Sequence, residues 1–231
     1  MKLANMYGSE PYAARLAGSS PALGTKQIYF MVNTVIFDAD GMVIAKPKIL
    51  PSKKFSQDLN VPLEEILVFF KNEFKQCKIG KADTKEVLKK YLPLWGWKKT
   101  TDEFLSYWFE CQSTINGQIV ESIKELRKNG IKCYLATDNE KNRVEYFENA
   151  LGFKNIFDGI FSSSKIGYEK TQKQFWQTVF EKLNNTDKDN VLYWDDDKEN
   201  IEIIKNFGFK VELYSDFKTY KNKLKKLKLI K

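Results

Sequence analysis

Two aspartates, one residue apart, end a short apolar stretch of the chain. Asp38 and Asp40 follow the run 32–37 (Val-Asn-Thr-Val-Ile-Phe), and Gly41 comes directly after them. The run is typical of a buried strand, which would present both carboxylates at its carboxyl end. Acids this close repel each other unless a cation or a shared proton separates them. Because hard divalent cations prefer oxygen ligands, the pair indicates a Mg²⁺ site with chemistry beside it. The purely structural alternative is an Asp-rich turn that caps the next segment.

Polar residues also follow the later apolar runs of the chain. They comprise a hydroxyl, two lysines and several acids: Thr137 with Asp138, Lys165 and Lys170, and Asp195 with Asp196 and Asp197. Acids can hold a metal, a hydroxyl and backbone amides can bind phosphate oxygens, and a lysine adds positive charge. The structural alternative for the acidic run is a helix N-cap, which one residue can combine with a role in a site.

The elements that must position these residues are visible beyond Gly117, where amphipathic and apolar segments alternate. Helical periodicity predicts helices, and short runs rich in β-branched and aromatic residues predict strands. The expected helices are 119–128, 140–151, 172–183 and 199–207, and the expected strands after the first are 131–136, 159–162, 191–194 and 209–214. Strands separated by single helices form a parallel sheet through right-handed crossovers. The sequence therefore predicts an α/β fold, a Rossmann-like parallel sheet with helices on both faces, with its ligand at the carboxyl ends of the strands.

The segment 45–116 has a different, purely helical pattern, in which apolar residues recur at helical spacing. Asp83 or Thr84 is expected to cap its middle helix, and Thr101 or Asp102 its last helix. The pattern predicts a small α-helical bundle. Inserted directly after the first strand, this bundle would lie over the carboxyl end of that strand.

The two ends of the chain differ from the rest. Residues 1–30 carry clusters of Gly, Ser and Pro, and we interpret them as a leader or a disordered extension. The core is then expected to comprise 31–44 and 117–220, followed by a basic C-terminal tail at 221–231. The net charge is +8 and the isoelectric point about 9.1. A basic balance suits a phosphorylated substrate or nucleic acid, although scattered lysines more often only solvate a surface.

Composition excludes several classes of protein. The three cysteines (Cys77, Cys111 and Cys133) are odd in number and widely spaced, which argues against a disulfide framework or a zinc knuckle and favours a reducing, cytoplasmic setting. The chain has no histidine, so acid–base chemistry must come from carboxylates, Lys or Tyr. No apolar run approaches the roughly 20 residues of a membrane span, which predicts a soluble protein.

Four stretches, taken in order, resemble the motifs of the haloacid dehalogenase superfamily of hydrolases. They are Asp38-Ala39-Asp40-Gly41, Thr137 after an apolar strand, Gly167-Tyr168-Glu169-Lys170, and Asp195-Asp196-Asp197-Lys198-Glu199-Asn200. The resemblance extends from Met31 to about Tyr220, and the first and last motifs are the specific ones. It is strongest to the branch that carries an α-helical cap after the first strand, which includes phosphatases and β-phosphoglucomutase-like enzymes.

The resemblance implies a role for each acid. Asp38 would attack phosphorus and form an aspartyl-phosphate, and Asp40 would act as general acid and base. Mg²⁺ would be held by Asp38, the backbone carbonyl of Asp40 and Asp196, with Asp195 as a second ligand or an orienting group. An acid at position 40 argues for phosphate transfer over dehalogenation, because an alkoxide leaving group needs a proton and a halide does not.

The phosphate contacts implied by the resemblance come from Thr137, from the backbone near Asp138, and from Lys170. Two positions depart from the family pattern. Asp138 stands where many relatives have Asn, so its charge must point away from phosphate or pair with a lysine. Thr171 stands where Pro is usual, which leaves Lys165 as a rival to Lys170.

The sequence thus favours a Mg²⁺-dependent phosphatase that acts on a small phosphorylated metabolite. A phosphomutase of the same fold is the nearest alternative. A different alternative is a nucleic-acid-binding module, for which only the basic run 221–231 speaks. Residues of the helical segment or its entry that could face a substrate are Lys46, Lys48, Phe74, Lys78, Lys81 and Trp95.

Overall fold

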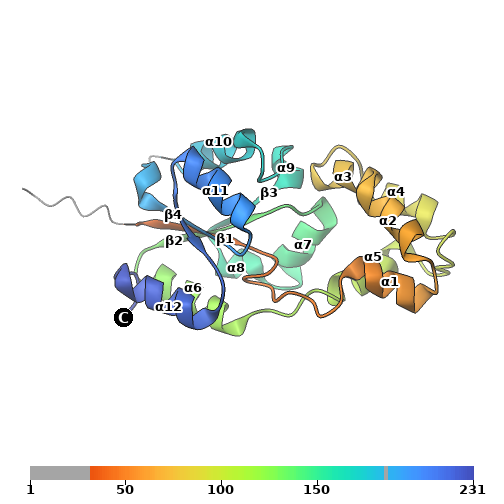
Figure 1. Cartoon of the computed structure of the whole chain (residues 1–231), viewed down its shortest axis with the longest axis horizontal. Coiled ribbons are helices and arrows are strands. Elements are labelled where there is room, and N and C mark those ends of the chain that lie inside the picture. The colour runs from red at the N-terminus through yellow and green to blue at the C-terminus, as the bar shows by residue number, and fades with distance from the viewer. Residues whose placement is uncertain (1–31, 185–186) are drawn as a thin grey trace, which may run out of the picture.

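The centre of the fold is a parallel sheet of 5 strands in the order β3-β2-β1-β4-β5. The computed structural model describes residues 32–184 and 187–231, so the expected leader at 1–30 lies outside the described residues. The strands are β1 (Thr34–Asp38), β2 (Lys132–Thr137), β3 (Gly159–Ser162), β4 (Val191–Asp195) and β5 (Lys210–Leu213). The predicted fold class is confirmed, and β1 lies in the middle of the sheet with β2 and β4 at its sides (Figure 1).

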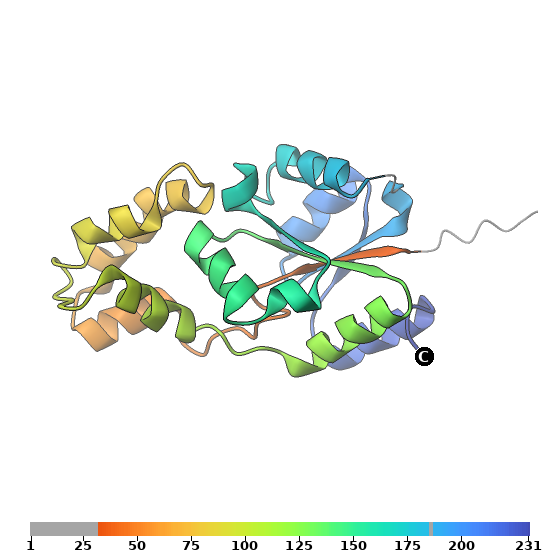
Figure 2. The same cartoon turned by 180° about the vertical axis from the view of Figure 1, so that it is seen from behind.

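Helices cover both faces of the sheet (Figures 1 and 2). They are α6 (Gly117–Lys128), α7 (Lys141–Asn149), α8 (Phe153–Ile156), α9 (Ser163–Ile166), α10 (Lys173–Lys182), α11 (Lys198–Phe207) and α12 (Phe217–Lys226), with a short 3-10 helix at Lys188–Asn190. Successive residues of a strand point to opposite faces. Accordingly, Phe37 packs with α6, α8 and α12, whereas Ile36 packs with α10 and α11. This burial on both sides explains why β1 is a continuous apolar run.

The segment between β1 and α6 forms a separate helical bundle. Its helices are α1 (Pro51–Leu59), α2 (Leu63–Lys71), α3 (Glu73–Lys78), α4 (Thr84–Tyr91) and α5 (Thr101–Glu110). The bundle has its own core, rich in aromatic rings around Phe55, Phe69 and Trp108. Trp95 is 2% exposed and Phe74 packs against the same core. Trp95, a candidate for facing a substrate, is therefore buried in the bundle core, and Phe74, a second candidate, is partly buried against that core.

Helix caps in the bundle agree only partly with expectation. Asp83 caps α4, since its carboxylate accepts from the backbone N–H groups of the next turn. The cap of α5 was expected at Thr101 or Asp102 and is instead Thr100. Thr100 forms a capping box with Glu103, in which each side chain accepts from the other residue's backbone N–H. The reciprocal pair satisfies two otherwise free amides, which favours Thr100.

The two chain segments that join the bundle to the sheet run side by side. Ile44 and Ile115 form an antiparallel bridge. Ala45 N donates to Thr114 O at 2.8 Å, and Asn116 N donates to the carbonyl of Val43 at 2.8 Å. The chain therefore enters and leaves the bundle at one place.

The structure corrects the expected basic tail at 221–231. Leu224, Leu229 and Ile230 are at most 6% exposed, and Asn129 Nδ2 of the neighbouring region donates to Leu229 O at 2.9 Å. Leu224 lies on the buried side of α12, and Leu229 and Ile230 pack on the same core after the helix has ended. The segment is part of the core and not a free arm for nucleic acid. Among the described residues, no helix is long and apolar enough to cross a membrane.

We expect the double substitution Leu229→Ala and Ile230→Ala to lower the free energy of unfolding by about 3 kcal/mol, because two buried side chains lose their contacts and leave cavities. Urea unfolding followed by circular dichroism measures this change. The matched control, Lys225→Ala with Lys226→Ala, alters exposed residues of the same segment and should stay within about 0.5 kcal/mol per site. Equal stability of the first variant and the parent would contradict the packing of this end.

Candidate active site

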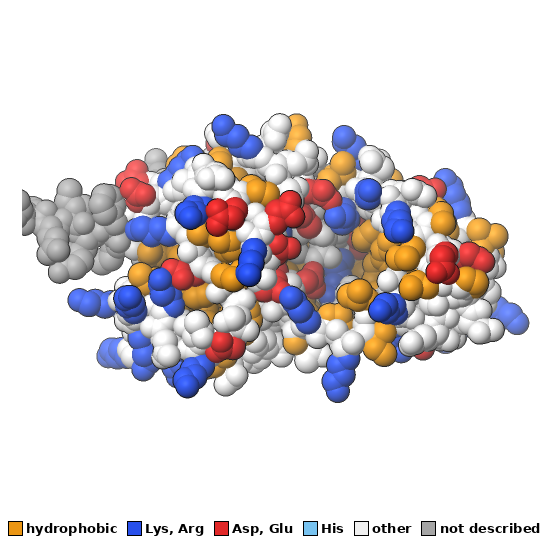
Figure 3. Space-filling model, in the orientation of Figure 1, with side chains coloured by type: hydrophobic (Ala, Val, Ile, Leu, Met, Phe, Trp, Pro, Cys, Tyr) orange, Lys and Arg blue, Asp and Glu red, His pale blue; other side chains and the backbone are white. Residues whose placement is uncertain are grey.

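The predicted site residues meet at the carboxyl ends of β1, β2 and β4. A pocket of about 250 Å³ is lined by Asp38, Asp40, Thr137, Asp138, Lys170, Asp195, Asp196, Asp197 and Asn200. Parallel strands place their carboxyl ends at one edge of a sheet, and neighbouring strands bring these residues within reach of one ion or ligand. Acidic side chains gather on the face between the sheet and the bundle (Figure 3).

Three carboxylates form a tight cluster in this pocket. One oxygen each of Asp38, Asp195 and Asp196 lies within 4.8 Å of the others. Lys170 Nζ forms ion pairs with Asp38 and with Asp195, the second at 2.9 Å. Lys170 is 4% exposed and Asp38 is 6% exposed, so these charges have little contact with water. One ammonium thus faces several acids.

Burial and neighbouring charges together shift the pKa values of Asp38 and Lys170. Burial raises the pKa of Asp38 to about 8, with Asp195 and Asp40 adding to the rise and Lys170 opposing it. Burial works to lower the pKa of Lys170, but Asp38, Tyr193 and Asp195 together raise it well above its ordinary value. Lys170 therefore stays protonated. Its single positive charge does not balance the negative charges of the acids around it. A divalent cation at the three oxygens would supply this charge.

The hydrogen bonds of Asp195 and Asp196 differ. Asp195 Oδ2 accepts from Lys170 at 2.9 Å, from Asn200 Nδ2 at 2.9 Å and from the Tyr193 hydroxyl, and its Oδ1 accepts from the Asp197 backbone N–H at 2.8 Å. In the described part of the chain, Asp196 has one ion-pair partner, the largely exposed Lys46. Asp195 is held by the protein, whereas Asp196 is free to bind another cation in exchange for a lysine.

Asp197, the third acid of this turn, serves the helix. Its side chain accepts from Glu199 N at 2.7 Å and caps α11. The structural alternative considered for the acidic run thus holds at this residue.

Gly41 makes room for Asp196. Its φ is +103°, a backbone region that favours glycine, and a Cβ at this position would lie 2.4 Å from Asp196 Oδ2. The turn it belongs to is closed by hydrogen bonds from Gly41 N to Ile44 O at 2.7 Å and from Ile44 N to Ala39 O at 2.8 Å. A side chain at position 41 would displace the acid.

Asp40 lies just beyond β1, with its side chain 46% exposed. Asn139 Nδ2 donates to Asp40 Oδ2 at 2.7 Å and to Thr137 Oγ1 at 2.6 Å. Arg143 Nη2 forms an ion pair with Asp40 Oδ1 at 3.7 Å. Asp40 is thus oriented from within the protein and open to the pocket on its other side.

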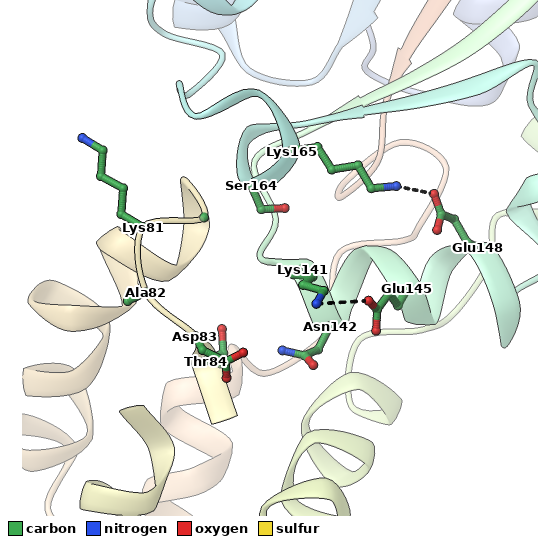
Figure 4. A pocket seen from close by; sticks show the side chains of 11 residues that line it. Lys81, Ala82, Asp83, Thr84, Lys141, Asn142, Glu145, Glu148, Ser164 and Lys165 are labelled. Carbon is green, nitrogen blue, oxygen red and sulfur yellow. Dashed lines mark hydrogen bonds and ion pairs between the residues drawn. The ribbon is translucent and has the colours of Figure 1, made fainter. Parts of the chain in front are cut away.

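Lys165 does not reach the site. Its ammonium pairs with Glu148 at 2.6 Å. The residue lines a separate pocket of about 420 Å³ between the bundle and α7. Lys81, one of the residues of the helical segment that could face a substrate, also lines that separate pocket (Figure 4). Of the two rival lysines, only Lys170 touches Asp38.

Asp138 and Trp176 hold the backbone around Lys170. Asp138 Oδ1 accepts from Lys170 N at 2.9 Å, and Trp176 Nε1 donates to Lys170 O at 2.6 Å. Burial raises the pKa of Asp138, and Lys170 and Lys78 oppose the rise. The carboxylate at position 138 is therefore held by a backbone N–H, and it lies close enough to Lys170 and Lys78 for their charges to influence it.

Sequence reasoning assigned no role to four residues that contact the predicted ones: Tyr193, Asn200, Asn139 and Arg143. Tyr193 precedes Asp195 by two residues on β4, so period-two alternation could have placed both on one face. Asn200 follows the acidic run within the first turn of α11. Nothing in the sequence indicated that Arg143 is buried, because a charged residue on a helix is ordinarily predicted to be exposed.

We expect Gly41→Ala to lower the free energy of unfolding by at least about 2 kcal/mol, from backbone strain together with the clash at Asp196. Thermal unfolding measures it. Gly96→Ala is the matched control, since Gly96 has φ +70° with nothing within 4 Å of a built Cβ. That variant isolates backbone strain and should lose only about 1 kcal/mol. Equal losses of stability in Gly41→Ala and Gly96→Ala would show that the Asp196 side chain moves away from a Cβ at position 41 without cost.

Comparisons with known proteins agree with this fold. A family model described as haloacid dehalogenase-like hydrolase matches residues 35–213. The HAD family enzyme BT-2542 from Bacteroides thetaiotaomicron, solved with magnesium and inorganic phosphate, superposes with a TM-score of 0.70 at 15% identity over 82% of this chain and 98% of that one.

Two further structures share the fold at lower TM-scores. A HAD phosphatase from Thermococcus onnurineus has a TM-score of 0.55 at 17% identity and covers 79% of this chain and 86% of its own. An L-2-haloacid dehalogenase from Xanthobacter autotrophicus has a TM-score of 0.55 at 18% identity, covering 85% and 83%. A sequence comparison with curated proteins found no match. Because the family model spans most of the sequence and all the strands of the sheet, the chain belongs to the haloacid dehalogenase-like hydrolases.

Proposed function

We propose that this hydrolase is a Mg²⁺-dependent phosphatase that cleaves a small phosphomonoester through an aspartyl-phosphate on Asp38. The observation that carries the proposal is the convergence of Asp38, Asp195 and Asp196 beside Lys170, with Asp40 at the rim of the same pocket. The relative solved with magnesium and inorganic phosphate supports the same chemistry.

The donor atoms suit magnesium. Carboxylate oxygens are the ligands of hard cations, and clustered acids that lack positive charge favour binding one. We assign Asp38, Asp196 and the backbone carbonyl of Asp40 as ligands, with Asp195 as the group that orients Lys170. Bound Mg²⁺ supplies charge that offsets the phosphoryl oxygens and the crowded acids.

Asp38 and Asp40 share the chemistry in two steps. An oxygen of Asp38 attacks phosphorus in line, and the bond to the ester oxygen breaks as Asp40 protonates that oxygen. Asp40, now a carboxylate, takes a proton from water, which attacks phosphorus and releases inorganic phosphate from Asp38. Thr137 and nearby backbone amides, including that of Asp138, bind the phosphoryl oxygens with Lys170.

Asp40 separates this activity from dehalogenation. An L-2-haloacid dehalogenase has the same fold, so the fold alone does not select the reaction. A halide leaves without a proton, and the acid two residues after Asp38 then has no task. An ester oxygen needs that proton, which favours a phosphate ester as the substrate.

We propose that the bundle acts as a cap over the site. It contacts the core next to the pocket: Ser163 Oγ donates to Lys78 O at 2.6 Å, and Lys78 Nζ pairs with Glu169 at 2.5 Å. Of the residues expected to face a substrate, Lys46, Lys48 and Lys78 remain. Their charge suits a small anionic metabolite, and the free cysteines suit a cytoplasmic setting.

We expect Asp38→Asn to lower phosphate release from p-nitrophenyl phosphate by about 10³-fold or more, because the nucleophile is removed. EDTA should abolish the parent's activity, and Mg²⁺ should restore it. Asp216→Asn is the matched control, since Asp216 caps α12 and Asn preserves a cap. Metal-independent turnover, or an active Asp38→Asn variant, would reject the proposal. Isomerisation of a hexose 1-phosphate without phosphate release would favour the phosphomutase.

We expect Asp196→Asn and Asp195→Asn to differ. The first removes a proposed ligand and should raise the Mg²⁺ concentration for half-maximal activity by about 10- to 100-fold. The second alters a carboxylate with four protein donors and should lower thermal stability more than metal affinity. Activity measured against Mg²⁺ concentration, together with thermal unfolding of both variants, distinguishes the ligand from the orienting group. The reverse pattern would exchange the two assignments.

A further inference from the structure

Arg143 is a buried cation between the sheet and the bundle. It is 1% exposed, although it lies in the first turn of α7. Its Nη1 donates to Phe109 O at 3.0 Å, and its Nη2 donates to Gln112 O. Both carbonyls are at the C-terminal end of α5, where the helix dipole favours a positive charge. The guanidinium thus ties α7 of the core to the last helix of the bundle.

Aromatic rings surround the same guanidinium. Its carbon lies 4.7 Å from the ring centre of Phe147, 5.3 Å from Phe109 and 5.6 Å from Tyr146. Burying an arginine among rings is costly unless its charge is paired. The charged partner here is Asp40, whose Oδ1 lies 3.7 Å from Nη2.

Asp40 is held by two residues of one segment. Asn139 donates to one of its carboxylate oxygens, and Arg143 faces the other. A second buried contact joins this segment to the bundle, since Thr84 Oγ1 of α4 donates to Glu140 Oε2 at 2.7 Å. The start of α7 therefore contacts both Asp40 and the bundle.

We propose that Arg143 is a positioning residue that holds Asp40 for proton transfer and ties its position to the end of α5. The inference rests on the proposed phosphatase function. Arg143 lies 3.7 Å from one carboxylate oxygen of Asp40 and is itself fixed by two backbone carbonyls, so it sets the orientation in which Asp40 meets the leaving oxygen. A shift of α5 relative to the core would move the carbonyls that hold Arg143, and Asp40 with it.

The test uses leaving groups that differ in their need for a proton. Nitrophenolate leaves readily, whereas phenolate depends more on protonation by Asp40. For Arg143→Met, we expect kcat/KM to fall for phenyl phosphate at least about 10-fold further than for p-nitrophenyl phosphate. Asp40→Asn should show the same selectivity. The double variant should be no worse than Asp40→Asn alone, because both changes remove one function.

Arg127→Met is the matched control. Arg127 also donates to two backbone carbonyls, those of Asn155 and Ile156, and pairs with Asp158, on the side of the core away from the pocket. A merely structural loss should affect both esters equally, as expected for this control.

Equal losses for both esters in Arg143→Met, or additive losses in the double variant, would overturn the inference. If Arg143→Met does not fold, Arg143→Lys takes its place, because it keeps the charge but lacks the planar fork whose two nitrogens contact the two carbonyls. The same selectivity, at smaller size, is then the supporting result, and its absence overturns the proposal. A parent that hydrolyses neither ester with Mg²⁺ would instead reject the proposed function.

Discussion

The buried ion pairs of Lys170 are the contacts on which the rest of the site depends. Its ammonium lies between Asp38 and Asp195, where repulsion between the two carboxylates would otherwise separate them. Leaving buried carboxylates unpaired costs about 3–5 kcal/mol. Several neighbours serve this one contact: Asp138 and Trp176 hold the Lys170 backbone, and Tyr193 holds Asp195. The acids can stay close because the lysine is fixed.

The sheet turns this local balance into a site. β1 lies between β2 and β4, so Asp38 has Thr137 on one side and Asp195 on the other. The chain turns at Gly41 after β1, and because Gly41 has no side chain, Asp196 can approach its backbone. Asp38, Asp40 and Asp196, for which we propose the roles of nucleophile, general acid and metal ligand, thus come from the ends of two neighbouring strands and the turns that follow them.

The fold and the main acids were predictable because their signals are local. Short apolar runs placed the strands, and helical periodicity placed α6, α7, α10 and α11, within a few residues, and acids at strand ends have one common edge to occupy. Contacts between distant segments were not predictable. Whether Lys165 or Lys170 faces Asp38 depends on Glu148, and the burial of Arg143 depends on carbonyls of α5. The expectation for the end of the chain was wrong because seven lysines in 218–231 obscured the buried residues Leu224, Leu229 and Ile230.

The paired segments at the base of the bundle have a consequence for how the chain is assembled. Ala45 and Thr114 are hydrogen-bonded neighbours, so all the residues between them leave and rejoin the sheet at one point. The entropic cost of closing such a loop grows only slowly with its length, so the connection itself would tolerate a different insert with the same two ends. Such an insert would also have to supply the two backbone carbonyls that hold Arg143 beside Asp40.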